Sequence, residues 1–353
     1  MPLWLDKHAP KGLDKLDFNR EIHFQMKNLI DSGNFPHLLL YGPSGAGKKT
    51  RIRCILKMLY GNSVTKLRLE NYNYQTPSKK KMEIATVSSN FHLEVNPTDA
   101  GIYDRLVIQE LIKQVASTVQ LDQSQNNSFK VVVLHDVDRL TREAQQALRR
   151  TMEKHVNTCR LILCCETTSR IISPTLSRCL LIRVRAPTED DIVNVLKGIC
   201  QKESLEIPLD LAKKIAKASD RNLRRAILMA EVARVQCTPM KPDQIVSEPD
   251  WKKYLQATSK MITSEQSPKK VLEIRGRLYD LLTHCIPPDV IMREIVDNLL
   301  EVCDHKVRLK LARIAGEYEF RMKQGSKPIY HLEAFVVGFM AIYKRNVEES
   351  LKK

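Results

Sequence analysis

The sequence predicts an α/β domain built on a parallel sheet, followed by parts that are helical only. In the first half of the 353-residue chain, short apolar runs alternate with segments of helical spacing, as in parallel strands covered by helices on both faces. After Pro187 the apolar residues recur only at helical spacing. We therefore expect an α/β domain over residues 1–186, a small helical lid over 187–240, and an all-helical C-terminal domain over 248–353.

The α/β domain is expected to hold its strands and helices in a fixed order. In chain order they are a strand at 37–41, a helix after residue 50, strands at 66–70 and 84–95, a helix at 104–119, a strand at 131–138, a helix at 143–154, and strands at 161–166 and 180–184. Ligands of such sheets bind at the carboxyl ends of the strands. A binding site is therefore expected at that edge.

The helical parts have clear starts and breaks. The run T-E-D-D from Thr188 is typical of a helix start, and residues 237–250 form a proline-containing linker. Pro268 and Pro288 each open a further helix, and Gly325 separates the last two. The long apolar stripes of these helices fit an ordinary core, and a helical domain with nothing catalytic in it suits oligomerisation.

Charge and composition narrow the class of partner. The formal net charge is +16, which favours nucleic acid or an acidic protein surface, although a merely basic, solvated surface has the same charge. No segment approaches the length of a membrane span, and the first residues lack the apolar core of a secretory signal. The chain has nine cysteines and no C-x-x-C pair. This pattern indicates an intracellular protein whose thiols are reduced, and it does not favour a zinc site.

The segment GPSGAGKKT is the most specific feature of the chain, since it lies between a strand and a helix as a phosphate-binding loop does. The nine residues expected to bind the nucleotide are Gly42, Pro43, Ser44, Gly45, Ala46, Gly47, Lys48, Lys49 and Thr50. Backbone amides would wrap the phosphates and Lys48 would reach the outer ones. The alternative is a glycine-rich turn without function.

One residue of this loop departs from the usual pattern. The position after Lys48 should be a serine or threonine whose hydroxyl holds Mg²⁺, and here it is Lys49. Thr50 has a hydroxyl but lies one residue later, a rotation of about 100° on a helix. The sequence therefore predicts binding of ATP or ADP, with poor support for Mg²⁺ and doubt about hydrolysis.

A second departure lies at the end of the strand VVVLHDVD. In ATPases of this class such a strand ends in Asp-Glu, the first residue holding Mg²⁺ and the second polarising the attacking water. Here His135 and Asp136 take these positions. Asp136 is the candidate base, but its side chain is one methylene shorter than glutamate and would reach the water poorly. Asp138 follows, and capping of the next helix is an alternative role for it.

Five segments occur in the order found in the small subunits of eukaryotic replication factor C. They are HLLLYGPSGAGKKT, NPTDAG (96–101), QQALRRTMEK (145–154), SRC (177–179) and NLRRAI (222–227). The chain resembles this family over its whole length, and most closely the third-subunit branch with a degenerate ATPase site. The resemblance implies an AAA+ fold in a hetero-pentameric, nuclear clamp loader, with residues 1–186 as the nucleotide-binding domain and residues 248–353 as a helical oligomerisation domain, or collar. It also implies three kinds of partner in DNA replication and repair: the other subunits, the sliding clamp and primer–template DNA.

The resemblance also implies roles for single residues. Arg178 of SRC matches an arginine finger that acts in trans on the nucleotide of the neighbouring subunit, where a planar, permanently charged guanidinium suits a phosphoryl group; an ordinary ion pair is the alternative. Arg224 matches the lid arginine that senses the γ-phosphate, and Arg225 would be a surface residue. Glu166 takes the place of an asparagine that orients water, a third departure from an active site.

Contacts with DNA are expected to reach the backbone only, from helices that line the ring. The candidates are Arg105, Gln109 and Lys113 on one helix and Gln146, Arg149 and Arg150 on another. An arginine on a helix face is more often solvated than bound, and a solvated face is the alternative for each of them.

The leading hypothesis is a clamp-loader subunit that binds nucleotide, hydrolyses it slowly or not at all, and works within a hetero-oligomer. A non-enzymatic AAA+ scaffold in DNA-damage checkpoint or alternative loader complexes is the alternative. A fully active motor, such as a branch-migration helicase, would need Ser or Thr after Lys48 and an Asp-Glu strand end. A small-molecule kinase would leave SRC unexplained.

Overall fold

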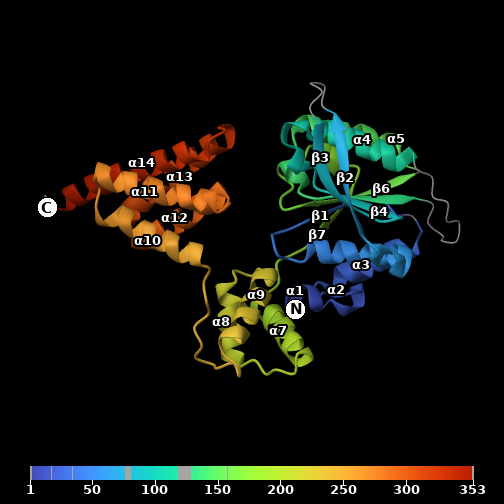
Figure 1. Cartoon of the computed structure of the whole chain (residues 1–353), viewed down its shortest axis with the longest axis horizontal. Helices are drawn as coiled ribbons and strands as arrows, with labels where there is room; N and C mark the ends of the chain where they lie inside the picture. Colours follow the sequence, from blue (N-terminus) through green and yellow to red (C-terminus); the bar gives the residue numbers. More distant parts are fainter. Residues whose placement is uncertain are drawn as a thin grey trace. The chain divides into compact units, whose positions relative to one another are not determined.

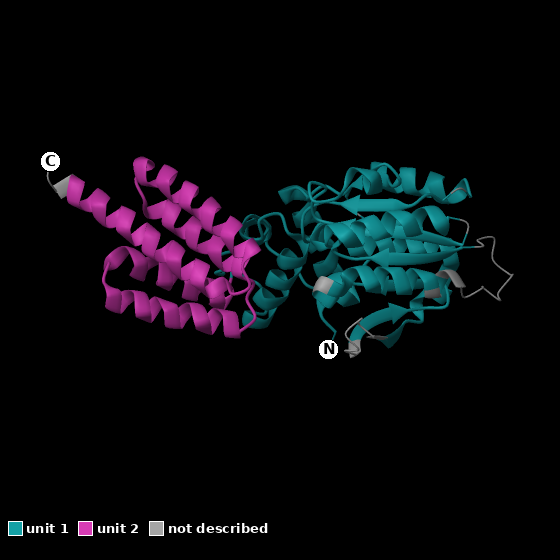
Figure 2. Ribbon diagram, turned by 90° about the horizontal axis from the view of Figure 1, so that it is seen from above, with its two compact units in different colours: residues 1–246 teal, residues 247–353 magenta. Residues whose placement is uncertain are grey.

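The computed structural model describes residues 2–16, 18–33, 35–75, 81–117, 129–156 and 158–351. The chain forms two compact units, residues 1–246 and 247–353 (Figure 1, Figure 2). The predicted α/β domain and lid both lie in the first unit, and the predicted collar makes up the second.

Seven strands of the first unit form one sheet, in the order β2-β3-β4-β5-β6-β1-β7. Five neighbouring strands run parallel: β4 (His92–Val95), β5 (Lys130–Leu134), β6 (Cys159–Cys165), β1 (Leu38–Tyr41) and β7 (Leu180–Arg183). The carboxyl ends of β1, β5 and β6 therefore meet at one edge, where the sequence predicts the site.

The predicted parallel sheet is present, and two further strands extend it at one edge in antiparallel orientation. Strands β2 (Arg68–Gln75) and β3 (Lys81–Ser88) pair antiparallel, and β3 pairs antiparallel with β4. The links between them are too short for a crossover, and short links join antiparallel strands. The expected single strand at 84–95 is interrupted at Ser89, whose backbone N–H donates to the carbonyl of His92 at 2.8 Å.

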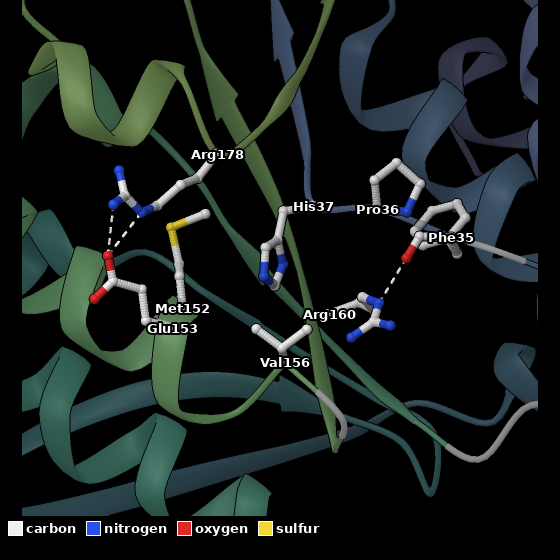
Figure 3. Close-up of a pocket in the computed structure, with 8 residues that line it drawn as sticks. All are labelled: Phe35, Pro36, His37, Met152, Glu153, Val156, Arg160 and Arg178. Atoms are coloured by element: carbon white, nitrogen blue, oxygen red, sulfur yellow. Dashed lines mark hydrogen bonds and ion pairs between the residues drawn. The ribbon is translucent and has the colours of Figure 1, made fainter.

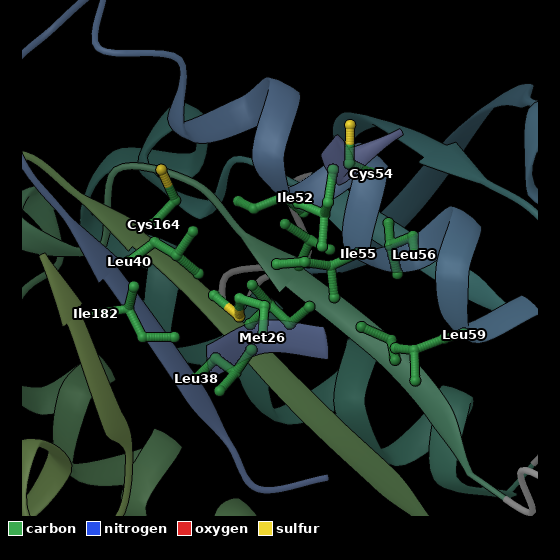
Figure 4. Packing of buried hydrophobic residues seen from close by; sticks show 14 of the residues in the cluster. Met26, Leu38, Leu40, Ile52, Cys54, Ile55, Leu56, Leu59, Cys164 and Ile182 are labelled. Atoms are coloured by element: carbon green, nitrogen blue, oxygen red, sulfur yellow. The ribbon is translucent and has the colours of Figure 1, made fainter. Parts of the chain in front are cut away.

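Helices cover both faces of the sheet, because alternate side chains of each strand point to opposite sides. Leu38 and Leu40 of β1 pack with α2 (Arg20–Asp31) and α3 (Lys48–Tyr60) in one core (Figure 4). Leu39 joins a second core with α4 (Asp104–Ser117) and α5 (Arg142–Lys154). The shorter helices of this domain are α1 (Trp4–Lys7), η1 (Leu13–Lys15), η2 (Gly61–Thr65), η3 (Pro97–Tyr103), η4 (Val137–Arg139) and α6 (Ser173–Leu176).

The lid has a hydrophobic cluster of its own. Its helices are α7 (Glu189–Lys202), α8 (Leu209–Ala218) and α9 (Leu223–Gln236). Thr188 begins α7 with the expected capping box, accepting from the backbone N–H of Asp191 at 3.2 Å while Asp191 accepts from Thr188 at 2.9 Å. Trp4, which is 2% exposed, joins this cluster, so the amino-terminal segment belongs structurally to the lid.

The second unit is a bundle of five helices around one apolar core (Figure 2). They are α10 (Asp250–Ser264), α11 (Pro268–Thr283), α12 (Pro288–Val302), α13 (His305–Gln324) and α14 (Pro328–Leu351). Among the described residues, no helix of either unit is both long enough and apolar enough to cross a membrane.

Candidate functional site

The phosphate loop joins β1 to α3, and its path requires all three of its glycines. Gly45 and Gly47 have φ +74° and +79°, a left-handed conformation that favours glycine. A Cβ on Gly42 would lie 2.0 Å from the carbonyl oxygen of Val184, which follows β7. The loop therefore follows a path that only this glycine pattern permits, at the carboxyl end of β1.

Two backbone carbonyls of the phosphate loop hold the Lys48 side chain. Its Nζ donates to the carbonyl of Gly42 at 2.5 Å and to that of Pro43 at 3.0 Å. The ammonium group thus lies at the mouth of the loop, where an anionic phosphate would meet it. This arrangement suits a nucleotide phosphate.

The donor set does not fit Mg²⁺ in the way usual for this class of ATPase. Lys49 lies on the first turn of α3, and its ammonium has no lone pair to offer a metal. His135, at the other metal-holding position, is already engaged: its Nε2 lies 3.3 Å from Glu94 Oε2. Both expected ligand positions therefore carry groups unsuited to a hard cation, which prefers carboxylate and hydroxyl oxygen.

Glu94 lies between two histidines at the ends of β4 and β5. His92 Nε2 is 3.7 Å from Glu94 Oε1, and both His92 and His135 are buried. Burial alone would raise the pKa of Glu94, but the contacts with His135 and His92 outweigh that effect and hold its pKa below the usual range. The sequence analysis missed this cluster, because strand alternation alone does not show that His92, Glu94 and His135 meet.

Two lysines and two aspartates act electrostatically on the end of β6. Burial raises the pKa of the Cys164 thiol to about 11; Lys48 and Lys49 oppose this rise, and Asp136 and Asp138 add to it. All four charged groups therefore act on the end of β6. Asp136 adopts φ +51° at the start of η4, and no hydrogen bond fixes its side chain within the described residues.

The lid reaches the phosphate loop through Asn222. This residue caps α9, its Oδ1 accepting from the backbone N–H of Arg225 at 3.2 Å. A Cβ on Gly45 would lie 1.8 Å from that same oxygen. The start of α9 therefore lies against the loop and brings the first turn, with Arg224, to the site. Arg224 is exposed, whereas Arg225 pairs with Asp220 at 2.9 Å.

Arg51 is a buried residue that sequence reasoning missed. The residue is 1% exposed, and its guanidinium donates to the carbonyls of Ala46 at 2.9 Å and Phe18 at 3.1 Å. It also lies over the Phe18 ring, 4.6 Å from the centroid. Burial lowers its pKa to about 10, and no carboxylate pairs with it among the described residues. Arg51 thus holds the loop and adds positive charge to a phosphate site.

Arg178 lies between α6 and β7, before the amino end of β7, whereas the phosphate loop follows the carboxyl end of the parallel neighbour β1. Its side chain is 31% exposed and is fixed by Glu153 of α5, with Nη2 at 2.6 Å from Oε1 (Figure 3). Both residues line a pocket of about 460 Å³ with Phe35, Pro36, His37, Met152, Val156 and Arg160. The side chain is therefore held by Glu153 and partly accessible, and its contacts in this chain are those of an ion pair.

The predicted DNA contacts fall into two neighbouring groups. Arg105 on α4 is exposed and pairs with Glu143 on α5 at 3.2 Å. Of its two companions on α4, Lys113 is exposed and Gln109 is half-buried. The α5 candidates line a second pocket, of about 430 Å³, formed by Arg142, Gln146, Arg149, Arg150, Glu153, Ile172 and Pro174. Arginines outnumber acidic residues in this pocket, which suits a phosphate backbone.

Comparisons with known protein families divide the chain into three matched regions. The replication factor C subunit 3 C-terminal domain matches residues 251–347, and an RCF1/5-like AAA+ ATPase lid domain matches 194–235. A family described as DNA polymerase III, delta subunit, matches residues 19–188.

Whole-length relatives agree with these matches. Replication factor C subunit 3 of Mus musculus is 55% identical over 352 residues, which covers 100% of this chain and 99% of that protein. Replication factor C subunit 5 of Schizosaccharomyces pombe is 46% identical over 347 residues, covering 97% and 96%. Among solved structures, the RuvB Holliday junction branch migration motor of Thermotoga maritima aligns with a TM-score of 0.51 at 17% identity, over 78% of this chain and 87% of that one, and shows the fold alone.

The family, the AAA+ fold and the place in DNA replication that the resemblance predicted are thereby confirmed. The chain belongs to the replication factor C subunit 3/5 family, the small subunits of the AAA+ clamp loader.

Proposed function

We propose that this chain serves a hetero-pentameric clamp loader in two unequal ways. It binds ATP or ADP at its own site with little or no hydrolysis, and it supplies Arg178 to the nucleotide site of the neighbouring subunit. The assembled complex would use ATP to open the sliding clamp and load it onto primer–template DNA in the nucleus, with Arg105, Gln109, Lys113, Arg149 and Arg150 along the DNA backbone.

The observation that carries this proposal is the contrast between the two sites. The loop and Lys48 form a phosphate cradle, but Lys49 and His135 occupy the positions that hold Mg²⁺ and Glu166 is exposed where water would be oriented. Arg178, by comparison, is held by an ion pair with Glu153, and its side chain is 31% exposed. The hydrolytic machinery is therefore altered in three places, while the group that would act on a neighbour is intact.

The test is the DNA- and clamp-stimulated ATPase of the reconstituted complex, with Arg178→Ala in this chain only. Turnover at the neighbouring site should fall by at least about a thousandfold, as expected for loss of an arginine finger, and total turnover should fall by that site's share. Lys48→Ala should reduce total turnover much less, because its own site contributes little hydrolysis.

Arg225→Ala provides a matched control. Arg225 is also an ion-paired arginine, with its side chain 26% exposed, so its loss reports the general effect of removing such a pair. If turnover is unchanged with Arg178→Ala, the SRC segment (177–179) has only a structural role, and the non-enzymatic AAA+ scaffold becomes the better description. A larger loss with Lys48→Ala than with Arg178→Ala would contradict the division of labour.

A further inference from the structure

One carboxylate oxygen links the proposed finger to the proposed DNA contacts. Glu153 Oε1 accepts from Arg178 Nε at 2.9 Å and lies 2.6 Å from Arg178 Nη2. The same oxygen lies 3.4 Å from Nε of Arg149, one helical turn earlier on α5. These two hydrogen-bonded arginines, with Arg178 first, lower the pKa of Glu153. Glu153 therefore shares one negative charge between two guanidinium groups.

The contacts of Arg178 fix its orientation without using all its donors. A guanidinium has five N–H groups in a rigid fork. Nε and Nη2 point to Glu153, and Nη1 donates to the carbonyl of Pro174 at 2.8 Å and lies 3.3 Å from Ser177 Oγ. Since Nη2 carries two hydrogens, one is left for an acceptor outside this set. These contacts fix the orientation of the guanidinium and leave one N–H available to an acceptor outside this chain.

The guanidinium of Arg149 pairs with Glu153 but is also a candidate to bind a DNA phosphate. It lines the arginine-rich pocket on α5, and its side chain is 47% exposed. A DNA phosphate that binds Arg149 would take it from Glu153, because a phosphate offers strong acceptor oxygens that are already placed along the DNA backbone. The carboxylate would then serve Arg178 alone, and the orientation of Arg178 would be more firmly fixed.

We propose that Glu153 is a positioning residue that orients Arg178 and couples it to DNA contact at Arg149. This inference rests on the proposed function, since it assumes that Arg178 acts on a neighbour's nucleotide. It adds a route by which DNA on the α5 face of this subunit raises turnover at the adjoining site.

Glu143 provides a matched control on the same helix. It also pairs with a candidate DNA-binding arginine, Arg105, at 3.2 Å, but it makes no contact with Arg178 in the described structure. Replacing either glutamate with glutamine removes a negative charge beside DNA. Only the Glu153 change also removes the carboxylate that orients Arg178.

The experiment titrates primer–template DNA into the reconstituted clamp loader and clamp, with each variant in this chain only. Glu153→Gln and Glu143→Gln should both lower the DNA concentration that gives half-maximal ATPase. Glu153→Gln alone should also lower the maximal DNA-stimulated rate, by about two- to fivefold, the range expected for an exposed ion pair. Glu153→Asp, which keeps the charge, should retain more of that rate, and in an Arg149→Gln background Glu153→Gln should no longer change the ratio of rates with and without DNA.

Two results would overturn the inference. One is a maximal rate with Glu153→Gln equal to that of the wild type, and the other is an equal loss with Glu143→Gln. Arg178→Ala, measured in the same series, separates the two proposals. If it abolishes the neighbour's turnover while Glu153→Gln does nothing, only the positioning role fails; if it does nothing, the proposed function fails as well.

Discussion

His37 shows how a single side chain takes its chemistry from its surroundings. It precedes β1, and its Nδ1 accepts from the backbone N–H of Leu161 at 3.0 Å. Burial and the nearby Arg160 guanidinium lower its pKa from 6.5 to about 4. The folded chain therefore holds a neutral imidazole at this position through the whole physiological range.

This shift predicts a loss of stability in acid. Because protonation is disfavoured in the folded state, the contribution of His37 is fully present above pH 6.5 and is lost as the pH falls from 6.5 towards 4. The free energy of unfolding should fall by about 3 kcal/mol over that window because of this residue alone. Denaturant unfolding at several pH values, for wild type and His37→Gln, measures the difference.

His155→Gln is the control for this prediction, since His155 lies in the same unit at the end of α5 and its side chain makes no hydrogen bond in the described structure. That variant measures how far the loss of another histidine from this unit changes the dependence of stability on pH. If His37→Gln changes this dependence no more than His155→Gln does, another group is responsible for the acid sensitivity.

At the scale of elements, the decisive contact joins the phosphate loop to α9. Gly45 and Asn222 are far apart in sequence, yet the missing Cβ of Gly45 makes room for the Asn222 side chain. That side chain also caps α9, so loop and lid share one polar group. A small change at Gly45 therefore acts on two elements at once.

Gly45→Ala should weaken nucleotide binding by at least about tenfold, the effect of losing one or two charge-assisted hydrogen bonds. The added methyl group would overlap Asn222 and force either the loop or the start of α9 to move. Titration of a fluorescent ATP analogue against the purified chain measures the affinity. Asn222→Gly in the same chain removes the overlap at little cost to the cap and should restore part of the binding.

Gly33→Ala separates overlap from backbone strain. Gly33 has φ +71°, and no atom lies within 4 Å of the place that an added methyl group would take, so alanine there costs only about 1 kcal/mol of stability. Its nucleotide affinity should match the wild type. Equal losses at Gly33 and Gly45 would mean that strain, not contact with the lid, explains the effect.

At the scale of the whole molecule, the chain is two units joined by a segment without helix or strand. This segment runs from the end of α9 at Gln236 to the start of α10 at Asp250. Its first part packs on the lid through Met240 and Val246, but Ile245 is 86% exposed. Each unit has its own core, so the link is the expected site of separation.

Brief digestion with thermolysin should therefore separate the units at the Gln244–Ile245 bond, where an exposed apolar residue follows the cleaved bond. Lys241 precedes a proline, and trypsin should cut this segment slowly. Mass spectrometry should identify residues 1–244 and 245–353 as the first products. If the first unit is cut internally while the linking segment is still intact, the segment is protected and the prediction is wrong.

Local signals in the amino-acid sequence were enough to predict the α/β domain followed by helices, the phosphate loop and the family. These signals are residue spacing, glycines that fit a turn, and short motifs in a recognisable order. The same signals identified three departures from the usual ATPase motifs, since each lies at a fixed position in its motif: Lys49, His135 and Glu166.

Which side chains meet became clear only from the folded chain. The antiparallel edge of the sheet, the Glu94 cluster, Arg51 against the loop and Asn222 against Gly45 all join segments whose spacing carries no sign of contact. Arg51 has the spacing of an ordinary helix residue, and only packing shows that it is buried. Glu153 is likewise an ordinary exposed glutamate in sequence, and only the placement of α5 beside the segment after α6 brings it to Arg178. Contacts between distant segments depend on packing, and packing is a property of the folded chain.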